Sequence, residues 1–129
     1  MTNKPLISII TVVYNGEKYL EETIQSVINQ TYDNIEYIII DGESTDGTLE
    51  IIKKYEDKID YWVSEHDSGI ANAFNKGVSL SQGKWILCLN SDDALADNLV
   101  IDIMLSRAGD TSIIDFVYGD YQILNRDTG

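Results

Sequence analysis

One run of eight residues near the start of the chain sets the strongest constraint on its fold. Residues 6–13 read Leu-Ile-Ser-Ile-Ile-Thr-Val-Val, and almost all of them are apolar or β-branched. A strand with one face in water would alternate apolar and polar residues, whereas a near-continuous apolar run is typical of a strand covered on both faces. Such strands occur mainly in parallel sheets flanked by helices. The run therefore predicts an α/β domain.

The following segments alternate between helix and strand character. Further strands are predicted at residues 35–40, 61–64 and 85–89. Helices are predicted at residues 17–30, 48–55 and 70–81. Strands joined by helices of about ten residues imply right-handed crossovers and a parallel sheet. We therefore expect a mostly parallel sheet with helices on both faces.

Two helices carry more detailed expectations, which concern the side chains that face the sheet. In the third helix these are Ile70, Ala73, Phe74 and Val78, and Gly77 suggests a close approach of the helix backbone to the sheet. A fourth helix follows Asp97, and its expected apolar face is Leu99, Val100, Ile103 and Met104.

The last segments, 113–118 and 121–124, are predicted to be strands. We expect a single domain over residues 1–129 that is truncated after Gly129, because no helix follows the last strand.

Composition and charge disfavour several classes of partner. The chain has 129 residues, of which 43% are hydrophobic, and this suits one compact domain. Its net charge of −13 disfavours nucleic acid and anionic membrane surfaces as partners. The single cysteine, Cys88, fits a reducing compartment, so we expect a cytoplasmic protein. No apolar run approaches the ~20 residues of a membrane span. Peripheral membrane attachment through further chain or partners, and the oligomeric state, stay open.

Acidic residues follow three of the four predicted strands. They are Asp41, Asp67, Asp92 and Asp93. In an open parallel sheet, ligands bind outside the carboxyl ends of the strands, so we expect these four side chains to face one crevice. Four carboxylates in one crevice repel each other unless a divalent cation and the hydrogen-bond donors of a ligand share the space. The pattern therefore favours chemistry with a hard cation and oxygen ligands.

Other common chemistries lack their residues. The turn after the first strand has no G-x-G-x-x-G, and the chain has no P-loop and no G-x-S-x-G. A zinc site would need more than one His and one Cys. The only histidine, His66, has no evident orienting partner and is expected to be an exposed loop residue.

Five motifs, in order from residue 6 to about residue 120, resemble those of family 2 glycosyltransferases. They are Thr11-Val12-Val13-Tyr14-Asn15, Asp41-Gly42-Glu43-Ser44-Thr45-Asp46-Gly47-Thr48, Glu65-His66-Asp67-Ser68-Gly69-Ile70, Asn75-Lys76-Gly77 and Asn90-Ser91-Asp92-Asp93. The resemblance implies a Rossmann-like GT-A fold that binds a nucleotide-diphosphate sugar, most commonly a UDP-sugar, with Mn²⁺ or Mg²⁺. It also implies inverting transfer of the sugar to a hydroxyl of a glycan or lipid-linked acceptor, as in polysaccharide biosynthesis.

The resemblance also implies roles for individual residues. Contacts to the nucleotide would come from Thr11, Val13, Tyr14, Asn15, Asp41, Asp67, Lys76, Asn90, Ser91 and Asp92. Among them, Asp41 would hydrogen-bond the base, and Asp67 would be a second acid on the nucleoside side. The segment 90–92 stands where the family has its D-x-D motif. Asp92 and Asp93 would share ribose contact and metal ligation, and which does which is left open.

The chain departs from the family pattern at three positions. Asn90 replaces the first Asp of D-x-D, and Glu43 stands where a small residue or Gly is common. Phe74 stands where many relatives have Arg, so a cationic contact to the nucleotide is either lost or supplied by Lys76. The resemblance implies a catalytic carboxylate beyond the first half of the domain, so the catalytic base is expected beyond Gly129. Asp120, the last acid that could lie near the acceptor, is expected to be a turn residue.

Two alternatives stay open at this point. A nucleotidyltransferase with a similar sheet would need a loop rich in Gly and Arg after the first strand, where this chain has only Gly16. A non-catalytic module that binds a sugar nucleotide or a metal would need the same crevice without the base.

Overall fold

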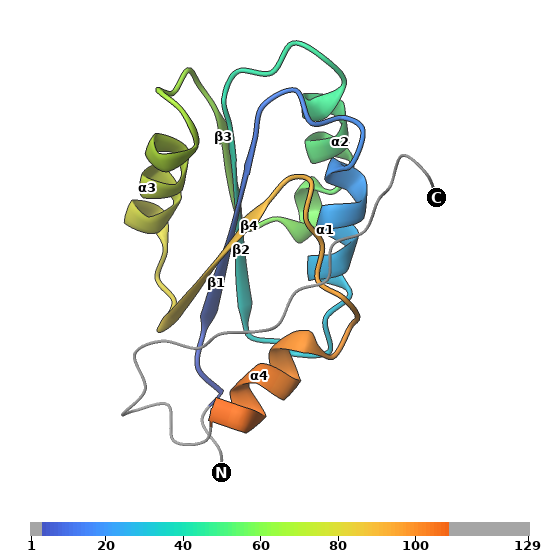
Figure 1. Ribbon diagram of the computed structural model, residues 1–129, viewed down its shortest axis with the longest axis vertical. Coiled ribbons are helices and arrows are strands. Elements are labelled where there is room, and N and C mark those ends of the chain that lie inside the picture. The colour runs from blue at the N-terminus through green and yellow to red at the C-terminus, as the bar shows by residue number, and fades with distance from the viewer. Residues whose placement is uncertain (1–3, 109–129) are drawn as a thin grey trace.

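The computed structural model describes residues 4–108 and shows one sheet with helices on both faces (Figure 1). The strands are β1 (Ile7–Val13), β2 (Ile35–Asp41), β3 (Tyr61–Ser64) and β4 (Trp85–Asn90). The helices are α1 (Leu20–Ile28), α2 (Thr48–Lys54), the 3-10 turn η1 (Glu56–Lys58), α3 (Ile70–Leu80) and α4 (Val100–Ala108). The strands predicted at 113–118 and 121–124, and Asp120, lie outside the described residues.

The four strands pair in the order β3-β2-β1-β4, and all three pairings are parallel. The chain moves outward from β1 to β2 and β3, and then crosses back through α3 to place β4 on the other side of β1. The reversal creates a topological switch point between β1 and β4, where open α/β sheets bind ligands. The predicted α/β fold with a parallel sheet is confirmed.

Each face of the sheet has its own core. Every residue of β1 is buried, as its apolar run predicts. One face is covered by α3, and the other by α1 and α2 (Figure 1). The α3 side is built from Ile10, Val12, Ile38, Ile40 and Ala73. The opposite core includes Ile9, Leu20, Ile24, Ile39, Ile52 and Ile101. Within residues 4–108, no helix combines the length and the apolar character needed to cross a membrane.

Two strands extend one residue beyond their predicted ends, and one helix begins later. β2 includes Asp41, which pairs with Val13 and Ser64 in the ladders on its two sides. β4 likewise includes Asn90. α1 begins at Leu20 instead of residue 17, because the carbonyl of Gly16 accepts the N–H groups of residues 19 and 20 in a preceding turn.

The predicted inner face of α3 is partly wrong. Ile70 and Val78 are 64% and 42% exposed, whereas Ala73 and Gly77 are buried against the sheet. The predicted close approach at Gly77 is confirmed, because a Cβ placed there would lie 2.4 Å from Ile10 Cγ2. Phe74, as predicted, is partly buried and packs against the core on this side of the sheet, so α3 meets the sheet through Ala73, Phe74 and Gly77.

The predicted apolar face of α4 is also partly wrong, although two of its four residues, Val100 and Met104, are half-buried. Ile101 is buried in the core, while Leu99 and Ile103 are exposed. Hydrogen bonds from the end of α1 and the loop after it set this rotation. The backbone N–H of Ile101 donates to Gln30 Oε1 at 3.1 Å, and Thr31 N donates to the carbonyl of residue 98 at 2.8 Å.

Candidate functional site

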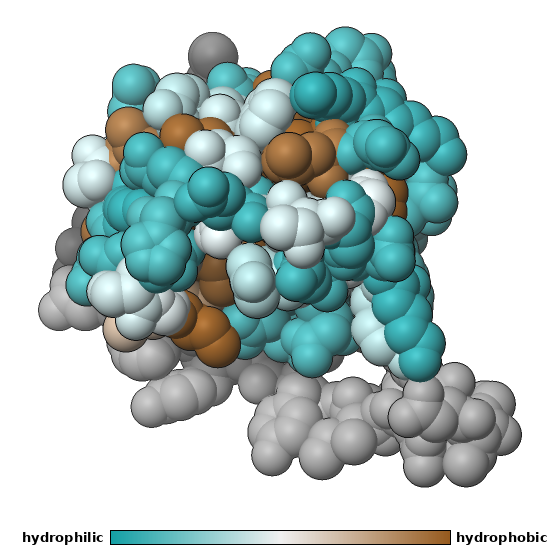
Figure 2. Space-filling view, turned by 90° about the horizontal axis from the view of Figure 1, so that it is seen from above, coloured by the Kyte–Doolittle hydropathy of each residue, from teal (hydrophilic) through white to brown (hydrophobic). Residues whose placement is uncertain are grey.

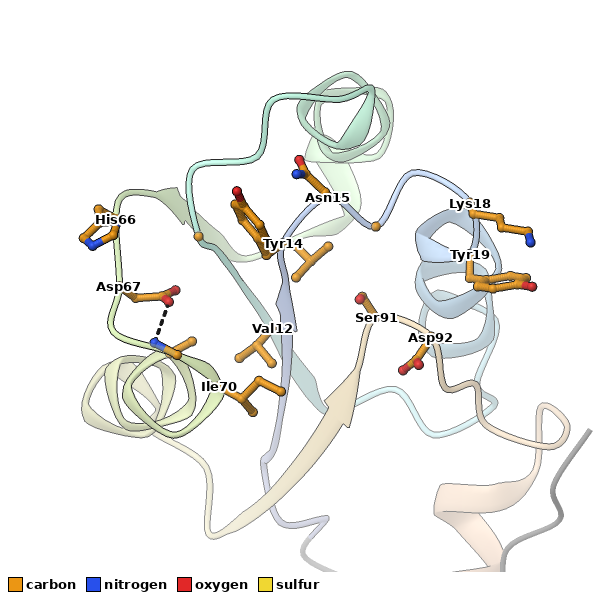
Figure 3. Close-up of a pocket in the computed structure, with 15 residues that line it drawn as sticks. Val12, Tyr14, Asn15, Lys18, Tyr19, His66, Asp67, Ile70, Ser91 and Asp92 are labelled. Atoms are coloured by element: carbon orange, nitrogen blue, oxygen red, sulfur yellow. Dashed lines mark hydrogen bonds between the residues drawn. The ribbon is translucent and has the colours of Figure 1, made fainter.

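A cavity of about 720 Å³ opens at the carboxyl ends of the four strands. Its wall takes residues from the segments that follow β1, β2, β3 and β4, and from the first turn of α3 (Figure 3). Figure 2 looks onto this end of the molecule and shows apolar surface between hydrophilic residues. The volume is typical of small-ligand sites, and the position is the one that the topological switch point predicts.

Six of the predicted nucleotide-binding residues line this cavity. They are Val13, Tyr14, Asn15, Asp67, Ser91 and Asp92. Asp67 lies on the α3 side of the cavity, while Ser91 and Asp92 lie on the α1 side, with Tyr14 above and between them (Figure 3). Tyr14 is 65% exposed, so its ring is free to cover a ligand. The sequence pattern thus brings together residues from three strand ends.

Asp41 does not line the cavity, contrary to expectation. Its side chain is fully buried, and both carboxylate oxygens accept hydrogen bonds from within the chain. Oδ1 accepts from Ser44 Oγ at 2.5 Å, and Oδ2 accepts from Ser44 N at 2.9 Å and from Ser64 Oγ at 2.7 Å. The reason is the extra residue of β2, which places this carboxylate between the β2–α2 loop and β3.

Four other predicted residues, Thr11, Lys76, Asn90 and Asp93, also lie away from the cavity wall. Thr11 is buried, and its hydroxyl shares a hydrogen bond with Tyr37 Oη at 2.9 Å. Lys76 Nζ lies 3.2 Å from Glu65 Oε1. Asn90 belongs to β4, and its carbonyl accepts the N–H of Asp93 at 3.0 Å in the turn that follows.

The expected convergence of four carboxylates is therefore wrong. Only Asp67 and Asp92 of the four line the cavity. Among the described residues, no group of three or more His, Cys, Asp or Glu side chains is arranged to hold a metal ion. A site for Mg²⁺ needs only one or two carboxylates when phosphate oxygens and water complete the coordination. Asp92 is exposed and lines the cavity beside Ser91, so these two residues fit the few protein ligands that such an ion needs.

The turn after β1 is hydrogen-bonded to the loop between β2 and α2. Asn15 N donates to Ser44 Oγ at 2.8 Å, and Gly16 N donates to Thr48 Oγ1 at 2.9 Å. In return, Thr45 N donates to Asn15 Oδ1 at 2.8 Å. Asn15 has φ 49°, a left-handed conformation that Asn tolerates better than most residues. These bonds fix the backbone that presents Tyr14 to the cavity.

Asp46 adds further hydrogen bonds between these two segments on the side exposed to solvent. Its Oδ1 accepts from Thr48 N at 2.9 Å, and its Oδ2 accepts from Glu17 N at 3.2 Å. Burial alone would raise the pKa of Asp46, but a hydrogen bond from the Thr48 hydroxyl to Oδ1, together with the two backbone ones, outweighs it and holds the pKa below its ordinary value. Asp46 is therefore a carboxylate that joins two loops.

Several cavity residues have no role in the sequence prediction. They are Val12, Gly16, Lys18, Tyr19, Gly42, His66, Gly69, Ile70 and Ala73. Gly42 and Gly69 have a recognisable signal, since each follows a strand and lies close to a predicted acid. A Cβ at Gly42 would lie 3.0 Å from Asp67 Oδ2, so this glycine leaves room for the carboxylate. His66 is exposed, as expected, and also borders the cavity.

The chain is similar in sequence to a known protein family and to several of its members. The family described as Glycosyl transferase family 2 matches residues 8–126. A protein named as a putative teichuronic acid biosynthesis glycosyltransferase, TuaG of Bacillus subtilis, is 46% identical over 98 residues, which are 72% of this chain and 38% of TuaG. The glycosyltransferase GlyG of Streptococcus pneumoniae is 36% identical over 98 residues, 74% of this chain and 33% of GlyG. The chain thus spans less than half the length of these relatives.

Solved structures show the same fold. The crystal structure of S. aureus TarS 1–349 in complex with UDP-GlcNAc superposes with a TM-score of 0.72 at 26% identity, covering 78% of this chain and 30% of TarS. The mannosyltransferase PcManGT of Pyrobaculum calidifontis, in complex with GDP-Man and Mn²⁺, gives a TM-score of 0.76 at 22% identity, covering 84% of this chain and 34% of PcManGT. With the family match over most of the chain, the resemblance seen in the motifs is confirmed, and the chain belongs to glycosyl transferase family 2.

Proposed function

We propose that the cavity binds a nucleotide-diphosphate sugar, and that the chain is the donor-binding part of an enzyme that transfers the sugar to an acceptor hydroxyl with inversion. The observation that supports this most directly is the placement of Asp67 and Asp92 on opposite sides of a cavity at the switch point. Asp67 is positioned to accept hydrogen bonds from the nucleoside. Asp92 and Ser91 are positioned for the ribose or for a cation beside the diphosphate.

A divalent cation is part of the proposal for an electrostatic reason. The chain carries a net charge of −13, and two carboxylates line the cavity against one lysine, Lys18, so a diphosphate would still meet net negative charge there. A bound cation is often the largest local charge in a site and reverses this effect. Asp92 would hold Mn²⁺ or Mg²⁺ together with phosphate oxygens, and the ion would neutralise the departing diphosphate. Asp93 lies off the cavity wall, so we assign the ligand role to Asp92.

We expect the donor to be a UDP-sugar, as in the TarS complex with UDP-GlcNAc. Because PcManGT was crystallised with GDP-Man, GDP is the first other nucleotide to test for binding. In the proposed transfer, an acceptor oxygen attacks the anomeric carbon opposite the diphosphate, and the bond from that carbon to the diphosphate breaks. The hydroxyl proton passes to a base that we expect outside residues 4–108. A glycan or lipid-linked acceptor and a cytoplasmic location complete the proposal.

Thermal unfolding with nucleotides tests donor binding. With MnCl₂ present, UDP at about ten times its Kd should stabilise the chain by about 1.4 kcal/mol and raise Tm by about 5 °C. Asp92→Ala should abolish the shift, while Asp93→Ala should reduce it less. Asp57→Ala, an exposed acid on η1, is the matched control that should retain the full shift. The absence of a shift with millimolar UDP, GDP and dTDP would contradict the proposal.

A second measurement separates an enzyme from a binding module. The longer protein that carries this chain should hydrolyse or transfer the sugar of the donor that gives the shift. Binding without any turnover of that donor would favour the non-catalytic alternative.

A further inference from the structure

The loop between β3 and α3 supplies one flank of the cavity. Its lining residues are His66, Asp67 and Gly69. The loop leaves the sheet where Glu65 N donates to the carbonyl of Asp41 at 3.0 Å. It enters α3 through Gly69, whose φ of 128° is a conformation that residues with a side chain rarely adopt. A segment that ends in such a glycine has several accessible shapes, so the contacts that choose one shape decide where Asp67 points.

Lys76 provides a contact across this loop. Its side chain extends from α3 back toward the end of β3, where Nζ lies 3.2 Å from Glu65 Oε1 and donates to the carbonyl of His66 at 3.1 Å. The side chain of Lys76 is only 24% exposed, while that of Glu65 is 56% exposed. Hydrogen bonds from a charged donor are stronger than those between neutral groups. The ammonium thus bridges the helix and the first two residues of the loop.

We propose that Lys76 is a positioning residue that holds residues 65–69 in the shape that presents Asp67 to the nucleotide. This proposal rests on the proposed function, because the shape of the loop matters only if the cavity binds a nucleotide. Asp67 itself is held by one oxygen, since Oδ1 accepts from Gly69 N at 3.0 Å. Its other oxygen, Oδ2, faces Gly42 at the cavity wall. The bridge at Lys76 therefore sets the direction of the oxygen that a ligand would meet.

The main rival is a direct contact between Lys76 and the diphosphate. The two mechanisms predict opposite effects for Glu65→Gln. If Lys76 bound phosphate directly, removal of the competing carboxylate would free the ammonium and tighten nucleotide binding. If Lys76 acts through the loop, the same change weakens its bridge and therefore weakens binding.

Calorimetric titration of the 129-residue chain with UDP and MnCl₂ distinguishes them. GDP or dTDP replaces UDP if the wild-type chain binds it more tightly. We expect Lys76→Met and Glu65→Gln each to raise Kd about fivefold, and the double variant to raise it no further, because both changes break one bridge. Lys76→Arg, which keeps the charge, should recover most of the affinity. Lys53→Met, an exposed lysine on α2, is the matched control with the same change of charge.

A spectroscopic readout tests the loop without ligand. The amide resonance of Gly69 should shift in both single variants and return toward its original position in Lys76→Arg. Tighter binding in Glu65→Gln, an unmoved Gly69 resonance, or independent losses that multiply to about 25-fold would overturn the role of Lys76 and leave the proposed function standing. A wild-type chain that binds none of the three nucleotides would overturn both. If Lys76→Met fails to fold, Glu65→Gln decides alone, since its carboxylate is largely exposed.

Discussion

The contact between α3 and β1 predicts that Gly77→Ala destabilises the wild-type chain but stabilises a chain in which Ile10 is replaced by alanine. Gly77 lies against Ile10, and a Cβ at this glycine would meet Ile10 Cγ2 at 2.4 Å, Cδ1 at 3.2 Å and Cγ1 at 3.3 Å. Normal contacts between carbon atoms are about 3.5–4.0 Å. Ile10 is fully buried in the middle of the sheet, so it has no open space into which to turn. Gly77→Ala therefore forces either a new rotamer of Ile10 or an outward shift of α3.

The magnitude follows from two opposing terms. An added methyl group in a close-packed core costs about 1–3 kcal/mol. Alanine gains about 1 kcal/mol over glycine within a helix. The expected net effect of Gly77→Ala is a loss of up to about 2 kcal/mol in the free energy of unfolding. In an Ile10→Ala background the clashing atoms are gone, and the same substitution should become stabilising by about 1 kcal/mol.

Urea unfolding of the four chains in this cycle measures both values. The midpoint should fall in Gly77→Ala with an unchanged m-value, which would mean that stability changes while the surface exposed on unfolding does not. The Ile10→Ala chain will itself be less stable by about 2–5 kcal/mol, so the cycle is best run at low temperature with a stabilising osmolyte. An equal loss from Gly77→Ala in both backgrounds would refute the argument that Ile10 is the obstacle.

Three other changes test the loops and the buried polar pairs. Glu43 has a φ of 69°, a conformation that glycine adopts more easily than other residues. Glu43→Gly should therefore raise the free energy of unfolding, measured by thermal unfolding, by about 0.5–1 kcal/mol, whereas Glu43→Ala should not raise it. Ser44→Ala leaves Asn15 N without its acceptor and should cost about 1–3 kcal/mol in urea; a cost near zero would contradict this reading. Tyr37→Phe leaves the buried Thr11 hydroxyl unpaired and should cost about 1–2 kcal/mol. Burial raises the pKa of Tyr37, so the wild-type chain should lose stability as pH rises above about 10, and the phenylalanine variant should lose less.

The sheet was the most predictable part of the molecule. A strand buried on both faces needs apolar residues at nearly every position, and residues 7–13 come close to meeting that demand. The alternation with short helices then left a parallel arrangement as the natural solution. The location of the cavity followed from the same rule, because the carboxyl ends of parallel strands share one edge. Asp67 and Asp92 were found in this way, while Tyr14 came from the family resemblance.

The faces of the helices were less predictable, for a physical reason. α3 and α4 each carry apolar residues on more than one side, and hydrophobic periodicity does not say which of them are buried. In α3, Ala73 was predicted correctly, but Gly77 rather than Ile70 or Val78 completes the buried face, because the small residue lets the helix approach Ile10. In α4, hydrogen bonds to Gln30 and Thr31 at the end of α1 decided the rotation. Contacts between segments distant in sequence leave no periodic signal.

Asp41 shows how one residue of strand length changes an inference about chemistry. If β2 had ended at residue 40, this carboxylate would have begun a loop and could have faced the cavity. Because the strand includes it, the side chain instead accepts hydrogen bonds from Ser44 and Ser64. Ser44 Oγ in turn accepts Asn15 N, so the buried carboxylate is connected to the turn beside Tyr14 by two consecutive hydrogen bonds. An acid at a strand end can thus act on a ligand site by fixing the backbone that forms it, and a sequence motif does not separate that role from direct contact.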